Sequence, residues 1–206
     1  MMIDHKYNYS IFKHEPLVKN QNYFINDIKI AREFLIKELK TDNLTWMYQK
    51  YNIFSILAGS NYFWNLYKDI GICVQRHITG NLQQELPKNM WMQSWLNWHT
   101  KKELLKRHNH ADNGNGYMHG FVSIEPRDTK TIFYKNYEDE KPIYHIDNEI
   151  GNIYIGDGNK WHEVISNSNF DEERITLGFD VLNQKCYKKL ISEFGNIDVN
   201  LSFIPI

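Results

Sequence analysis

The chain has 206 residues, 42% of them hydrophobic and 15% aromatic, and a formal net charge of -1 at pH 7. This length allows one sizeable core, so we expect a single domain over residues 1–206. A charge near zero gives no indication of nucleic-acid binding. No run of roughly 18 apolar residues and no apolar N-terminal segment occur, so we expect a cytoplasmic protein without a membrane span. Cys73 and Cys186 form no CxxC motif, which agrees with a reducing compartment.

Residues 1–85 are predicted to be mainly helical, with one edge strand. Residues 7–18 resemble a short strand that Pro16 interrupts. Apolar residues spaced by three or four predict an amphipathic helix over residues 22–40, and a second helix is expected over residues 61–73. Because this part of the sequence contains no chemical motif, we expect its helices to support a β-sheet.

Residues 90–182 are instead typical of short strands separated by turns. About seven or eight segments rich in β-branched and aromatic residues recur at regular spacing, which favours a double-sheet jelly roll or barrel. The sequence therefore predicts an α+β protein whose β core is supported by N-terminal helices. Residues 183–206 are expected to form a closing helix and a tail.

Three potential metal ligands, His108, His110 and Asp112, lie in one short segment. Residues i and i+2 of a strand point to the same side, so a His-x-Asp pair can reach one ion. Non-haem Fe(II) sites use two histidines and one carboxylate and leave the opposite positions open. His162, far along the chain, can supply the third ligand from a neighbouring strand. Arg174 follows on the next strand, where a guanidinium can bind the carboxylate of an organic acid.

The segment allows two registers of metal binding. In the first, His110 and Asp112 bind the metal with His162, and His108 is a neighbour in the pocket. In the second, His108 and His110 bind it with His162, and Asp112 lies outside. We favour the first register because a carboxylate ligand is usual in such sites and because the following Gly-rich loop fits it.

Three motifs resemble the Fe(II)/2-oxoglutarate-dependent oxygenases, and specifically their prolyl-hydroxylase-like branch. They are HADNGNG at residues 110–116, DGNKWHEV at 157–164 and RITLGFD at 174–180. The resemblance covers residues 90–182 and implies a double-stranded β-helix, the cupin-like form of the jelly roll. It also implies that His110, Asp112 and His162 bind Fe(II) and that Arg174 binds the distal carboxylate of 2-oxoglutarate. By analogy Asn97 contacts the co-substrate, and Ser123 lies on a strand that can face it.

The resemblance implies a dioxygenase that uses O2, forms succinate and CO2, and hydroxylates an organic substrate. Ascorbate is a candidate accessory reductant. A proline in a peptide or protein is the substrate that this branch favours, while small metabolites stay open. The sequence leaves the oligomeric state undecided.

Two other functions fit the same residues. A jelly roll can be a binding module for a sugar or metabolite, with a structural metal. A zinc hydrolase would activate a water molecule, but we rank it last because no general base stands at a telling spacing, with Glu163 left as an open candidate. Ordinary roles also exist for single residues: Arg174 could pair with Glu172 or Glu173 at a strand edge, and His119 could pack in the core or line the cavity.

Overall fold

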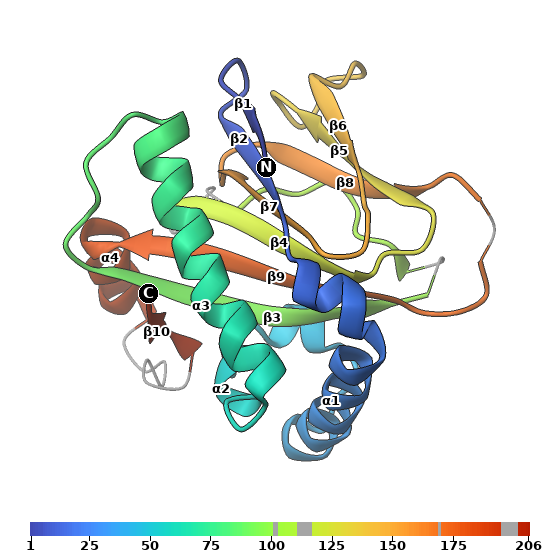
Figure 1. The fold of residues 1–206 in the computed structure, drawn as a ribbon. Helices are drawn as coiled ribbons and strands as arrows, with labels where there is room; N and C mark the ends of the chain where they lie inside the picture. The colour runs from blue at the N-terminus through green and yellow to red at the C-terminus, as the bar shows by residue number, and fades with distance from the viewer. Residues whose placement is uncertain (101–102, 111–116, 169, 195–201) are drawn as a thin grey trace.

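The computed structural model describes residues 1–100, 103–110, 117–168, 170–194 and 202–206, and its strands form two antiparallel sheets (Figure 1). The large sheet has the order β1 (Met2–Asp4), β2 (Tyr9–Lys13), β7 (Asn152–Asp157), β4 (Met118–Glu125), β9 (Arg174–Asn183), β3 (Met90–His99) and β10 (Ile204–Pro205). The small sheet has the order β6 (Tyr144–Asp147), β5 (Thr129–Tyr134) and β8 (Trp161–Ser166). The predicted strands of the β core are therefore confirmed.

Helices α1 (Glu15–Leu39) and α3 (Asn61–Arg76) cross one face of the large sheet (Figure 1), and the short α2 (Ile53–Ile56) packs beside them. Their apolar stripes and the facing strand residues form one core cluster. Among its fully buried members are Phe24, Ile28, Leu66, Ile70, Val122, Ile153 and Leu177. The expectation that the N-terminal helices support a sheet is confirmed. Within the described ranges, no helix is long and apolar enough to cross a membrane.

The first helix begins earlier than predicted. Pro16 lies in its first turn and does not interrupt a strand, because β2 already ends at Lys13. The first backbone N–H groups of a helix have no partner within the helix, so proline loses nothing there. His14 caps the helix by accepting a hydrogen bond from the Leu17 N–H through Nδ1, at 3.1 Å. The predicted start at residue 22 was therefore too late for the whole helix, although Asn20 has non-helical backbone angles and the long helical run begins just after this kink.

The C-terminal region follows the prediction in part. Helix α4 (Gln184–Phe194) occupies the expected residues. The residues assigned to a tail, however, include β10, which pairs with the edge of β3 through Ile204 and Met92. Two residues are too short to produce a strand pattern in a sequence, so this pairing depends on the neighbouring edge.

Side-chain alternation along the strands gives the large sheet two different faces. On β9, the apolar residues Ile175, Leu177, Phe179 and Val181 belong to the core under the helices. Arg174, Thr176, Gly178 and Asp180 line a cavity on the opposite face, towards the small sheet. This second face contains the candidate site.

Two short segments complete the fold, and one of them lines that cavity. The 3-10 turn η1 (Leu44–Met47) contacts β3 and brings Thr45 and Trp46 to the cavity. A further short helical segment, η2 (His77–Asn81), continues α3 and contacts β2.

Candidate metal centre

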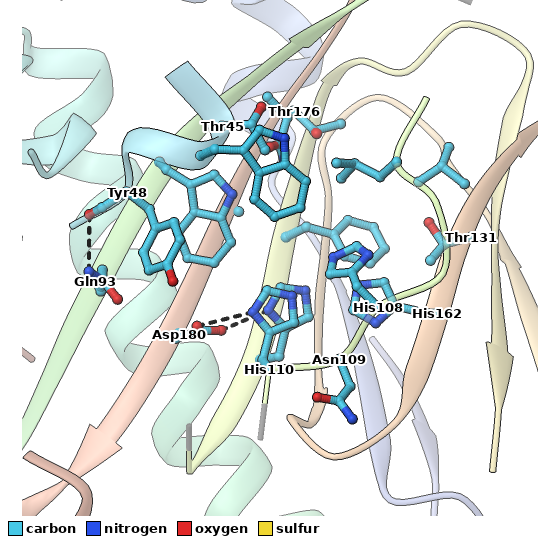
Figure 2. A pocket seen from close by; sticks show the side chains of 18 of the residues that line it. Thr45, Tyr48, Gln93, His108, Asn109, His110, Thr131, His162, Thr176 and Asp180 are labelled. Carbon is cyan, nitrogen blue, oxygen red and sulfur yellow. Dashed lines mark hydrogen bonds and ion pairs between the residues drawn. The ribbon is translucent and has the colours of Figure 1, made fainter. Parts of the chain in front are cut away.

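His108 and His162 lie opposite each other because their backbones form an antiparallel bridge. The His108 N–H donates to the His162 carbonyl at 2.9 Å, and the His162 N–H donates to the His108 carbonyl at 2.8 Å. The Val164 N–H donates to the Leu105 carbonyl at 3.0 Å. Residues 105–108 therefore extend the small sheet beyond β8, and both imidazoles lie on its inner side, as Figure 2 shows.

His110 completes a group of three imidazoles. Its backbone N–H donates to the Gly158 carbonyl at 2.9 Å, which fixes the segment beside the turn before β8. One ring nitrogen from each of His108, His110 and His162 lies within 4.8 Å of the other two. Three donors that approach so closely from two segments can share one metal ion.

Asp180 holds His110 and a fourth imidazole, that of His119 on β4. Its two carboxylate oxygens contact His110 Nδ1 at 3.1 Å and His119 Nδ1 at 2.8 Å, and Figure 2 shows Asp180 beside His110. The His110 and His119 rings are stacked, with 3.7 Å between their centroids. A carboxylate that accepts from Nδ1–H of an imidazole leaves its Nε2 unprotonated and able to bind a metal.

Trp95 supports the stacked imidazoles from the large sheet. Its ring lies 5.5 Å from the His110 ring, at an interplanar angle of 19°. Gly178, opposite it on β9, leaves the space for the indole, because a Cβ there would lie 2.5 Å from the Trp95 ring. Glycine, which has no Cβ, therefore fits at position 178, whereas any larger residue would displace Trp95.

Burial keeps the imidazoles of His108, His119 and His162 neutral at pH 7. Burial, and then the neighbouring His110, lower the pKa of His108 to about 4. The same two causes lower the pKa of His119 to about 4, although Asp180 opposes the shift. Burial and the other three histidines hold the pKa of His162 well below its usual value. Neutral imidazole is the form that binds metals, so the group is ready for a cation near neutral pH.

Asp180 supplies the negative charge of this region. Burial alone would raise its pKa, but His110 and His119 hold the pKa of the Asp180 carboxyl well below its usual range. The carboxylate therefore stays ionised beside the imidazoles. It also forms a second close group of possible ligands with His110 and His119.

The donor set fits a transition-metal ion. His110 Nε2 is buried and has no hydrogen-bond partner among the described residues. A buried polar atom without a partner costs free energy, and a bound cation would remove that cost. Imidazole nitrogens bind iron, zinc, copper and nickel, whereas calcium and magnesium prefer oxygen ligands.

Arg174 lines the same cavity from the other end of the β9 segment. It is only 2% exposed and donates to the Thr129 hydroxyl at 3.3 Å and to the Thr176 hydroxyl at 3.2 Å. Within the part of the chain that the structure describes, no carboxylate pairs with it, so the suggested ion pairs with Glu172 or Glu173 are absent. Burial lowers the pKa of Arg174 to about 10, which leaves it charged at pH 7. A buried, unpaired guanidinium is suited to an anionic ligand.

Asn97 and Ser123, the two other predicted co-substrate contacts, have different positions. Asn97 lines the cavity, and its buried Oδ1 has no hydrogen-bond partner among the described residues. The hydroxyl of Ser123 is also buried and lacks a partner in the described part of the chain, but Ser123 is not in the cavity wall. Asn97 is therefore better placed than Ser123 to contact a ligand.

The cavity itself has a volume of about 200 Å³ and is lined by both the imidazoles and Arg174. A larger cavity of about 620 Å³ adjoins it and shares Thr45, Trp46, Leu105 and His108 as a wall. The indole of Trp46 is 58% exposed, and its ring lies 6.4 Å from the His108 ring. A large aromatic surface therefore lies beside the imidazoles where solvent can reach it.

Asp112, the carboxylate of the favoured register, lies outside the described residues, so the choice between the registers stays a prediction. The sequence analysis did not single out Asp180. Its contact with His119 depends on the pairing of β4 with β9, where His119 and Asp180 are opposite each other. Asp180 is the last residue of the RITLGFD motif, but the sequence alone does not show that it contacts His119.

No protein-family model and no curated protein sequence matches the chain. Solved structures do match it, over 86% of its length in each of three cases. A Pseudomonas putida prolyl-4-hydroxylase has a TM-score of 0.52, 8% identity and 89% of its own chain covered. Apo HygX from Streptomyces hygroscopicus has a TM-score of 0.51, 9% identity and 83% covered. The epimerase SnoN, in complex with Fe3+, alpha ketoglutarate and nogalamycin RO, has a TM-score of 0.50, 10% identity and 79% covered.

At these identities the matches define the fold. The chain has the double-stranded β-helix fold of 2-oxoglutarate- and Fe(II)-dependent oxygenases, as the resemblance of its motifs implied.

Proposed function

We propose that the protein is an Fe(II)- and 2-oxoglutarate-dependent dioxygenase. The observation that supports this most strongly is one cavity lined by three close imidazoles and by the buried Arg174, which pairs with no carboxylate among the described residues. His110 and His162 would hold the iron in either register. We place His108 as the third ligand, because its ring nitrogen already lies with theirs, and keep Asp112 as the alternative.

Each residue around the proposed metal centre would have a defined task. Bound iron would supply the activation of O2 and the oxidation of 2-oxoglutarate to succinate and CO2. Asp180 keeps the Nδ1 proton of His110 in place, so that Nε2 stays available to the metal. Arg174 would form two parallel hydrogen bonds to the distal carboxylate of 2-oxoglutarate. The buried wall residues Phe121 and Val164 limit the water that reaches these groups.

We also propose that the substrate is a polypeptide that carries the reacting residue, with proline as the first candidate. The prolyl-4-hydroxylase match supports this choice only through the fold. The larger cavity beside the proposed metal centre offers room for an extended substrate chain, and the exposed indole of Trp46 offers an apolar surface for the ring of a proline.

The direct test measures succinate formed from 2-oxoglutarate. Turnover should require Fe(II), should disappear in His162→Ala, and should increase when a proline-containing peptide is added. Trp46→Ala should remove the effect of the peptide and leave the slow peptide-independent turnover. Unchanged turnover in His162→Ala would exclude the proposed centre.

The two registers can be separated by a matched pair of variants. If His108 is a ligand, His108→Ala should lose metal binding while Asp112→Ala keeps it. The opposite result would establish the His110/Asp112 register.

A non-catalytic binding module would give a different result from the oxygenase in either register: zinc would bind as well as iron, and no 2-oxoglutarate would be consumed. The hydrolase alternative has little support, because Glu163 already accepts hydrogen bonds from Arg107 and Tyr134, at 3.1 and 2.7 Å.

A further inference from the structure

The bridge between His108 and His162 has an outer side as well as an inner one. Because side chains alternate along a strand, the neighbours Arg107 and Glu163 lie on the side away from the imidazoles. There the Arg107 guanidinium donates to Glu163 Oε1 at 3.1 Å. An ion pair on the outside therefore joins the same two segments that carry the imidazoles on the inside.

Arg107 makes further contacts that a surface ion pair would not need. It donates to the carbonyls of Tyr137 and Asp139, at 2.6 and 2.8 Å. Its guanidinium carbon lies 3.4 Å from the centroid of the Tyr134 ring. The Tyr134 hydroxyl in turn donates to Glu163 Oε1 at 2.7 Å. One side chain thus connects the 105–110 segment to β8, to β5 and to the loop after β5.

This arrangement is suited to fixing strand register. A planar guanidinium that stacks on a ring and donates in several directions tolerates little displacement, and a lysine could not reproduce it. The segment that carries His108 pairs with β8 through few backbone hydrogen bonds in its described part. A slip of one residue would turn His108 outward and Arg107 inward.

We propose that Arg107, Glu163 and Tyr134 form a register clamp, a group of positioning residues that sets the affinity of the imidazoles for the metal ion. The inference rests on the proposed metal centre, but it concerns how that centre is held and not what it does. Among the described residues, none of the three clamp residues belongs to a group of possible metal ligands, and Arg107 lines the larger cavity.

The test is a calorimetric titration of the metal-free protein with Mn²⁺ and with Co²⁺, without 2-oxoglutarate. Arg107→Gln should weaken binding by roughly 10- to 100-fold, the loss typical when a partner that orients metal ligands is removed. The matched control is Arg127→Gln. Arg127 has a similar exposure, 26% against 20% for Arg107, and pairs with Glu172 at 2.6 Å, away from the imidazoles. This control should bind both metals within about 2-fold of the wild type, as surface ion pairs contribute little.

Two milder variants decide the question if Arg107→Gln does not fold. Tyr134→Phe keeps the ring under the guanidinium and loses only the hydrogen bond to Glu163, and Glu163→Gln loses the charge. Each should weaken metal binding by a smaller factor, and each should alter the visible absorption of the Co²⁺ complex, which reports ligand geometry.

The outcomes separate the clamp from the proposed function. A wild-type protein that binds neither metal would contradict the metal centre itself. Wild-type binding with equal affinity and an identical Co²⁺ spectrum in the folded clamp variants would overturn the clamp and leave the proposed function intact.

Discussion

The two faces of the large sheet are built from the same strands but carry different kinds of side chain. On the helix-covered face, residues such as Leu177 and Val122 are fully buried among apolar neighbours. On the cavity face, the same strands bury Arg174 and His119 and leave the Asp180 side chain only 15% exposed. Apolar burial stabilises the first face at about 25 cal/mol per Å². Burial of charged and polar groups on the second costs free energy unless each finds a partner.

The comparison shows where the molecule accepts a cost in stability. Asn97 Oδ1 and His110 Nε2 are buried without partners in the described part of the chain, and Arg174 has no carboxylate there. All three residues line the cavity, although other buried side-chain atoms without a partner in the described part of the chain, such as His77 Nε2 and Ser123 Oγ, lie outside it. The helix face should therefore control folding, and the cavity face should control binding.

The largest expected effect is on the cavity face. His162→Ala should lower metal affinity by more than about 100-fold, beyond the loss from removing a supporting partner. The free energy of unfolding should fall by much less than the free energy of metal binding, because the variant also removes a buried polar ring. Metal titration and urea denaturation of the same sample measure both. Retained metal affinity would show that His162 is not a ligand.

The reverse should hold on the helix face. Leu177→Ala should lower the free energy of unfolding by about 3 kcal/mol, since it leaves a cavity in a packed core. Metal affinity of the folded fraction should be unchanged. Urea denaturation gives the first quantity and titration at low temperature the second. A large loss of metal affinity would show that the two faces are coupled.

A buried imidazole on the helix side gives a test through pH. Burial lowers the pKa of His77 to about 4, and its Nδ1 contacts the Ser10 hydroxyl at 2.9 Å. Between pH 6.5 and 4 the unfolded chain binds a proton here that the folded chain does not, so stability falls as pH falls. His77 should contribute about 2 kcal/mol of the loss between pH 7 and pH 5.

Urea denaturation at both pH values checks this contribution. His77→Gln should flatten the pH dependence, whereas the exposed control His145→Gln should not. An equal loss in wild type and His77→Gln would contradict the prediction.

The smallest expected effect comes from Arg174 on the cavity face, where binding and stability should change in different directions. Arg174→Met should raise the apparent Michaelis constant for 2-oxoglutarate at least about 10-fold, because the carboxylate loses its partner. The same variant should keep the melting temperature or raise it, because it removes a buried charge that pairs with no carboxylate in the described ranges. Thermal unfolding and steady-state kinetics test the two halves separately. Strong destabilisation would mean that Thr129 and Thr176 already compensate the charge.

Sequence reasoning reached the parts of this account that depend on short-range pattern. Strand alternation and turn residues predicted the strands of the β core, and motif order brought His110, His162 and Arg174 to what is one cavity in the structure. The pairing of His119 with Asp180 depends on the register between distant strands, which no local pattern records. Helix α1 began earlier than predicted because Pro16 is compatible with both a strand end and a first helical turn. Strand β10 was missed because it exists only through its neighbour.

The central claim is that the imidazoles and Arg174 form one site for a metal and 2-oxoglutarate together. Calorimetric titration of 2-oxoglutarate into the protein, with and without Mn²⁺, tests it most directly. We predict that 2-oxoglutarate binds at least about 10-fold more tightly when the metal is present, and that the metal in turn binds more tightly with 2-oxoglutarate by the same factor. Equal binding of 2-oxoglutarate with and without metal, or no binding in either case, would contradict the account.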